Sequence, residues 1–69
     1  MATYKVKISE EAIDYRIQIL KIIDSVKIAR VSDLLEFILE CATKDIEAVE
    51  YELRKSERRD DYCLWERID

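Results

Sequence analysis

The pattern of apolar and polar positions predicts a strand at each end of the chain. Residues 3–8 alternate apolar side chains with Lys5 and Lys7, which is the period-two signature of a half-buried strand. Residues 62–68 alternate in the same way. We expect these two strands to pair as a small antiparallel sheet that brings the two ends of the chain together.

A wide apolar arc marks residues 10–24 as a central helix. Ser9 precedes it as a cap, and Glu10 and Glu11 fall in the first turn, where the helix dipole favours anions. At roughly 100° per residue the apolar side chains sweep about 220°, which is wider than a surface helix needs. We therefore expect contacts on two sides, with the domain body on one and either a second subunit or the terminal strands on the other. The second side would hold Tyr15, Ile19 and Ile22.

A dense apolar run predicts a second, shorter helix over residues 33–40. Ser32 stands in the capping position, and Asp33 and Glu36 lie near the positive end of the helix dipole. The preceding residues 25–31 mix apolar and polar positions without a clear period, and we expect a packed linker there.

The pattern of residues 43–59 predicts a third helix, most of whose surface is exposed. Thr43 is its expected cap, acidic residues lie in its first turn, and basic residues gather in its last turns. Its apolar residues form one narrow stripe of Ile46, Val49 and Leu53. A helix held along one edge and otherwise exposed has the geometry of a recognition helix.

The length of 69 residues bounds the chain to one small domain, residues 1–69, near the size at which a core only just offsets chain entropy. A second chain would add to that core, so a homodimer is expected. The sequence has no glycine, proline or histidine, and 41% of its residues are charged. Hyperthermophile proteins contain few thermolabile amide residues and many Lys, Glu and Arg residues. The composition of this chain has the same bias and favours a thermophilic source.

Enzyme chemistry and metal binding are poorly supported by the residue types present. Histidine, the commonest general base, is missing, and the two cysteines, Cys41 and Cys63, do not have metal-ligand spacing. We expect no catalytic residues, no metal and no cofactor. Both cysteines fit apolar positions, so two buried thiols are the simpler interpretation and a disulfide is the alternative. Without an apolar leader or a long apolar run, a cytoplasmic protein that does not enter the membrane is expected.

The order of strand, wide helix, short helix, displayed helix and terminal strand resembles a small winged helix-turn-helix domain over residues 3–68. This resemblance implies an α+β fold, with three helices and a small antiparallel sheet formed by the N- and C-terminal strands. It also implies that the third helix enters the DNA major groove and that residues 58–62 form the wing. The DNA-binding residues it implies are Lys44, Tyr51, Arg54, Lys55, Arg58 and Arg59.

A second resemblance covers only the start of the chain. The segment KVKISEEA, a lysine-bearing strand that leads into a Ser-capped helix, is similar to the opening of a ribbon-helix-helix repressor. That family would use Lys5 and Lys7 to read bases from strands paired between two subunits. It leaves residues 43–68 without a role.

The function expected from these patterns is double-stranded DNA binding in transcriptional regulation, by a homodimer in which Trp65 is one more interface anchor. The alternative is an acidic winged-helix module that docks on a basic protein and does not bind DNA. The formal net charge of −4 favours the alternative, because DNA affinity comes mainly from Lys and Arg on phosphates. The arginines near residue 58 favour DNA, although cations also suit a helix C-terminus in a purely structural role.

Overall fold

The computed structural model describes residues 1–31, 34–59 and 62–69. Within these residues the chain forms four strands, two α-helices and one short 3-10 helix. In chain order they are β1 (Ala2–Ile8), α1 (Glu10–Leu20), β2 (Lys27–Val31), β3 (Glu36–Cys41), η1 (Thr43–Asp45), α2 (Ile46–Arg59) and β4 (Cys63–Arg67).

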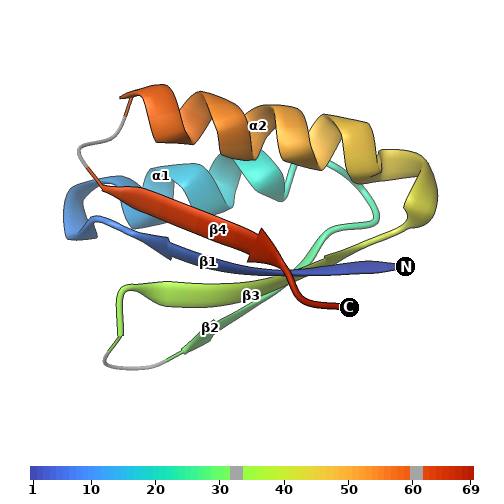
Figure 1. Cartoon of the computed structure of the whole chain (residues 1–69), viewed down its shortest axis with the longest axis horizontal. Helices are drawn as coiled ribbons and strands as arrows, with labels where there is room; N and C mark the ends of the chain where they lie inside the picture. Colours follow the sequence, from blue (N-terminus) through green and yellow to red (C-terminus); the bar gives the residue numbers. More distant parts are fainter. Residues whose placement is uncertain (32–33, 60–61) are drawn as a thin grey trace.

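The four strands form one antiparallel sheet in the order β2-β3-β1-β4. Both helices lie on the same face of this sheet, above the strands in Figure 1. A βαββαβ chain with this strand order is the split βαβ, or ferredoxin-like, arrangement. No described segment covers the other face of the sheet, which we call the open face.

The core lies between the sheet and the helix layer. Alternate residues of β1 point into it, and Tyr4, Val6 and Ile8 are at most 1% exposed. Phe37 and Leu39 of β3 are fully buried beside them. The helices supply the upper half of the core with Ile13, Leu20, Val49 and Leu53.

The predicted strands at the two ends of the chain are confirmed. They pair with each other in antiparallel register, with Lys5 opposite Glu66 and Ile8 opposite Cys63. The N–H group of Ile68 donates a hydrogen bond to the carbonyl of Thr3 at 2.8 Å, so both ends of the chain lie together as expected.

The three-helix winged fold is wrong, because the residues expected to form the second helix form β3. Phe37, Leu39 and Cys41 face the core, whereas Glu36, Ile38 and Glu40 face the open side. A short, densely apolar run fits a buried strand as well as a helix, and only the sheet partners on both sides decide between them. The expected cap Ser32 lies outside the described residues.

The expected linker 25–31 is also different, because its last five residues form strand β2. Ile28 packs against the core and Arg30 pairs with Asp14 of α1, so these two side chains face the helices. The strand pairs with β3 alone and forms one edge of the sheet. Its weak alternation reflects an edge position with few buried residues.

Neither the expected wing nor the ribbon-helix-helix pairing is found among the described residues. Arg58 and Arg59 of the expected wing are the last residues of α2, and residues 60–61 lie outside the described part. β1 is hydrogen-bonded to β3 on one side and to β4 on the other. Its backbone is therefore satisfied within its own chain and cannot pair with a strand of a second subunit.

Candidate functional site

α2 is held along one narrow stripe, as the sequence predicted. Val49 and Leu53 are at most 1% exposed, and Ile46 is half-buried against the same core. The opposite side of the helix is exposed, with Tyr51 at 62%. Thr43 does not cap this helix with its hydroxyl, because it belongs to η1 and accepts a hydrogen bond from the amino group of Met1 at 3.1 Å.

Four of the residues expected to bind DNA come together on the exposed side of α2. Residues seven positions apart on a helix lie on the same side, as do those four apart. The four are Tyr51, Arg54, Lys55 and Arg58. The ammonium group of Lys55 lies 5.7 Å from the centre of the Tyr51 ring, which is cation–π distance. Arg59 is exposed at the helix end, whereas Lys44 lies in η1, before the helix.

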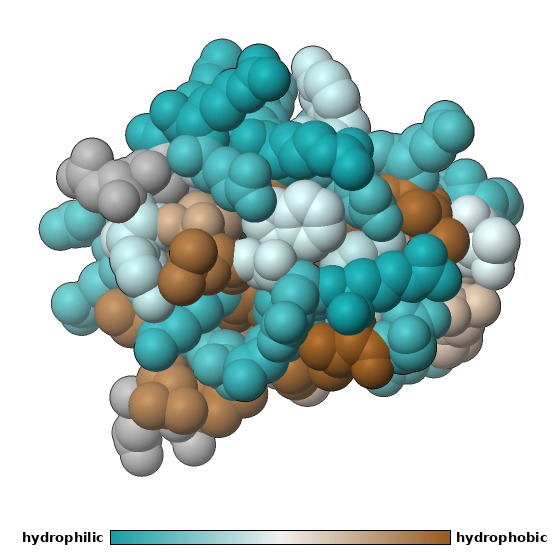
Figure 2. Space-filling view, in the orientation of Figure 1, coloured by the Kyte–Doolittle hydropathy of each residue, from teal (hydrophilic) through white to brown (hydrophobic). Residues whose placement is uncertain are grey.

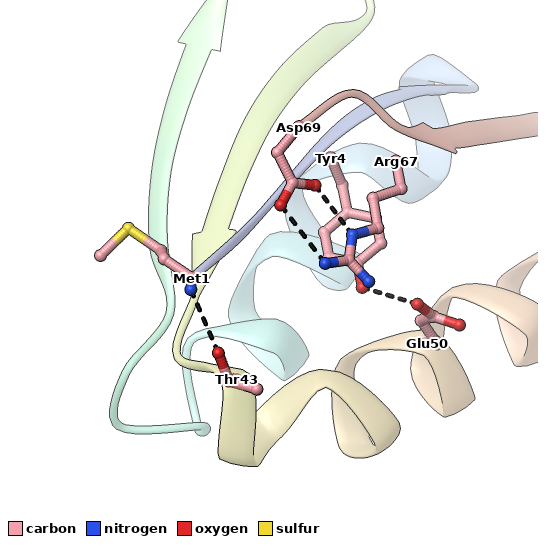
Figure 3. A network of polar contacts seen from close by, with 6 residues as sticks. All are labelled: Met1, Tyr4, Thr43, Glu50, Arg67 and Asp69. Atoms are coloured by element: carbon pink, nitrogen blue, oxygen red, sulfur yellow. Dashed lines mark hydrogen bonds and ion pairs between the residues drawn. The ribbon is translucent and has the colours of Figure 1, made fainter.

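A polar network joins α2 to the sheet and engages one of these cations. The Tyr4 hydroxyl donates a 2.7 Å hydrogen bond to Glu50, and Arg54 pairs with the other oxygen of the same carboxylate at 2.9 Å. Figure 3 shows the Tyr4 and Glu50 side chains meeting between β1 and α2. Arg54 also lies over the Trp65 ring at 5.8 Å. Burial, and then the bond to Glu50, holds the pKa of Tyr4 well above its usual range.

Arg67 and Asp69 form a second polar contact near the end of the chain, also drawn in Figure 3. The guanidinium Nε lies 2.8 Å from one carboxylate oxygen of Asp69, and Nη2 lies 3.3 Å from the other. The hydrogen bond from Arg67, and then one from the Thr3 backbone, lowers the pKa of Asp69 to about 2. This pair links Asp69 to Arg67 at the end of β4.

The open face of the sheet carries the outward side chains of all four strands. They are Thr3, Lys5, Lys7, Lys27, Ala29, Val31, Glu36, Ile38, Glu40, Leu64 and Glu66. A shallow depression of about 330 Å³ lies over its centre and the β4 side, lined by Lys5, Lys7, Glu36, Leu64, Trp65 and Glu66. In Figure 2 the helix layer at the top is mainly hydrophilic, and the lower part, where the sheet lies, carries hydrophobic patches between hydrophilic side chains.

The open face combines charged side chains of both signs with apolar ones. Three lysines and three glutamates lie among its apolar residues, and in the described parts of the chain none of the six makes an ion pair or a side-chain hydrogen bond. Leu64 is 60% exposed and Ile38 is half-buried between them. The face therefore offers unpaired charge of both signs beside exposed apolar surface.

Sequence reasoning missed this face because it assigned β3 to a helix. The sequence predicts that the strand of Lys5 and Lys7 pairs only with the C-terminal strand, but β1 lies between β3 and β4, and both lysines lie in the middle of the open face. Residues 36–41 carry only part of the signal: Glu36 and Glu40 alternate with the three core residues of β3, but the outward residue between them, Ile38, is apolar.

The residues expected at a dimer interface do not form one surface. Tyr15 is 58% exposed on α1 and Ile22 is 79% exposed in the turn that follows, with Ile19 half-buried between them. Trp65 lies on β4 instead, with its ring 6.0 Å from that of Tyr4 and Arg54 over it. Its indole N–H is buried and has no hydrogen-bond acceptor among the described residues.

The described residues do not include a group of three or more His, Cys, Asp and Glu side chains able to hold a metal ion. Cys41 and Cys63 are buried thiols, and burial raises the pKa of Cys41. In the same part of the chain, neither helix has the length and apolar character needed to cross a membrane.

Comparison with known proteins adds no relative: no family model, curated protein or solved structure matches this chain.

Proposed function

We propose that this protein is a protein-interaction module and that the open face of its sheet contacts the partner. The observation that carries the proposal is the set of lysines and glutamates, without ion pairs among the described residues, that is interleaved with Ile38 and Leu64. A protein surface can pair with both signs of charge and bury the apolar side chains between them. We place this role in the cytoplasm, where buried thiols such as Cys41 and Cys63 stay reduced.

The chemistry of the open face favours protein over nucleic acid. Single-stranded nucleic acids are held on sheets by exposed aromatic side chains that stack on bases, and the open-face positions contain no aromatic residue. Phosphate contacts need a local excess of positive charge, whereas this face has as many glutamates as lysines.

Site-specific photo-cross-linking tests this proposal in the cells that carry the gene. A photoreactive phenylalanine analogue replaces Ile38 at the centre of the open face. The matched control carries it at Gln18, an exposed position of α1. We expect a protein adduct of defined mass from position 38 and none from position 18, and we expect Lys7→Glu to abolish it. Adducts with nucleic acid, or protein adducts from position 18 alone, would overturn the proposal.

The exposed side of α2 supports a second candidate, contact with the phosphates of a nucleic acid. Tyr51, Lys55 and Arg58 share that side, and neither Arg58 nor Arg59 forms an ion pair within the described residues. α1 packs beside α2 on the same face of the sheet. α2 is therefore part of a flat layer, and its contact would be with the nucleic acid backbone and not with bases deep in the major groove.

An electrophoretic shift with random duplex DNA at low salt tests this candidate. If α2 binds phosphates, the native protein shifts DNA at tens of micromolar, within about the range of non-specific DNA affinity. The double variant Arg58→Glu with Arg59→Glu should then lose the shift. The matched control, Lys5→Glu with Lys7→Glu, makes the same change in net charge on the open face and should retain it. No shift by the native protein would exclude this candidate.

A further inference from the structure

The open face is complementary in charge to a second copy of itself. We propose that its partner is a second copy of this chain, stacked face to face about a two-fold axis that runs parallel to the strands between β1 and β3. This inference rests on the proposed function, because it names the partner of the same surface.

The register of the central strands separates the two signs of charge. On the open face, the lysines of this central pair lie on β1 and the glutamates on β3. Lys7 is directly opposite Glu36, Lys5 is opposite Ile38, and Thr3 is opposite Glu40. Lys5 and Lys7 thus form a positive column, and the two glutamates form a negative column beside it, one strand spacing of about 4.8 Å away.

This arrangement decides between the two possible axes. An axis parallel to the strands, between β1 and β3, stacks β1 on β3 of the second copy. Residues opposite one another on neighbouring strands form a row, and this axis stacks each row on the same row of the second copy. Lys7 then faces Glu36 of the second copy, and the same contact forms again on the other side of the axis. An axis across the strands would stack β1 on β1 and β3 on β3, which brings like charges together. Of these two axes, the one parallel to the strands is the electrostatically favourable one.

The outer strands fit the same axis. β2 then lies over β4 of the second copy, and Val31 and Leu64 occupy the row of Lys7 and Glu36. Leu64, which is 60% exposed in the single chain, would pack on Val31 of the second copy. Stacked sheets twist by about 30° relative to each other, which displaces the contacts on the outer strands more than those on the inner strands of the same row. The central contact between Lys7 and Glu36 is therefore the one to test.

The size of the face predicts a weak, reversible dimer. Four strands about 4.8 Å apart and about 20 Å long present roughly 400 Å² from each copy. Stable interfaces bury about 800 Å² from each partner, so this contact lies at the low end. We expect dissociation in the micromolar range, and the measurement must extend to about 1 mM.

Sedimentation velocity of the native chain and of single charge reversals tests the register. K7E and E36K each turn both central contacts of the homodimer into like-charge contacts. We expect each variant to dimerise at least about tenfold more weakly than the native chain. The matched controls K21E and E47K make the same charge changes at exposed positions outside the sheet and should dimerise as the native chain does.

A mixture of K7E and E36K makes the test specific for contacts between chains. In the mixed dimer every central contact joins opposite charges, although each chain alone still carries its own like-charge neighbours. We expect the mixture to dimerise about as tightly as the native chain. A folding defect in either variant cannot produce this rescue, and circular dichroism of each variant confirms that it is folded.

Two results would overturn the inference. One is a native chain that stays monomeric up to about 1 mM at low salt, above the range expected for an interface of this size. The other is a mixture of K7E and E36K that associates no better than each variant alone. If position 38 nevertheless cross-links to a different protein, the proposed function holds and only the identity of the partner is wrong. If position 38 yields no protein adduct, both fail.

Discussion

Tyr4 is the residue that ties the helix layer to the sheet. It is fully buried under α2, and its hydroxyl reaches Glu50, which also accepts a hydrogen bond from Arg54. The alternation of β1 predicted that Tyr4 faces the core. Its partner was not predictable, because the contact joins residues 46 positions apart and depends on how α2 crosses the sheet. The alternation along β1 thus predicted which side of the sheet Tyr4 occupies, but not its hydrogen-bond partner.

Replacing Tyr4 by phenylalanine should destabilise the fold. The ring still fills its place, but Glu50 loses a buried donor, and hydrogen bonds to charged groups contribute about 1.5–3 kcal/mol. We expect the free energy of unfolding in urea to fall by about this amount. Tyr51→Phe, at an exposed position of the same helix, is the control and should be neutral. Equal stability of Tyr4→Phe and the native chain would show that the bond does not contribute.

Asp69 predicts a specific loss of stability in acid. Its folded pKa is lowered from 3.8 to about 2, first by the hydrogen bond from Arg67. A lowered pKa means that the ionised form stabilises the fold above the ordinary pKa and that this contribution is lost as the pH falls toward 2. Unfolding measured from pH 7 to pH 2 should therefore depend less on pH in Asp69→Asn. Asp24→Asn, which neutralises an exposed acid elsewhere, should retain the native profile.

At the scale of the elements, the sequence was sufficient where one period was clear. The bounds of β1, α1, α2 and β4 all lie within four residues of those expected, and β1 pairs with β4 as expected. The two inner strands were missed. β3 places Ile38 on the open face, which interrupts the alternation and gives the run of three apolar residues that resembles a buried helix. β2 buries little, so its alternation is weak.

The anchoring of α2 gives a prediction at this scale. Leu53 is 1% exposed in the core, and Leu→Ala at such a site costs about 2–5 kcal/mol through lost contacts and a cavity. Leu53→Ala should therefore unfold at a much lower urea concentration than the native chain. Tyr51→Ala, two residues away on the exposed side, should change stability by less than about 0.5 kcal/mol. Similar losses in both variants would mean that the helix has no single buried side.

At the scale of the whole molecule, the two expected functions depend on different surfaces. DNA binding was inferred from the exposed side of α2. That exposed side is present, although the fold around it has two α-helices and four strands in place of the expected three helices. The open face arises only when β1, β3 and β4 are neighbours, and that order is set by long-range pairing. The net charge of the sequence pointed to a protein partner as the alternative function, but the surface that we propose for this partner could be recognised only from the topology.

A reversible dimer through the open face should make thermal stability depend on protein concentration. A chain of 69 residues has a small core, and a partner that binds only the folded state raises the free energy of unfolding by mass action. At a hundred times the dissociation constant the gain is about 2.7 kcal/mol, and in a domain of this size each kcal/mol raises the melting temperature by about 4–8 °C.

Calorimetry at about 10 µM and about 1 mM, on either side of the expected dissociation range, should thus show a rise of several degrees for the native chain. K7E should show a smaller rise than the native chain, because its central contacts are repulsive, whereas K21E should behave as the native chain does. A native melting temperature independent of concentration would mean that the open face does not join two copies, since no stabilising association could then be present.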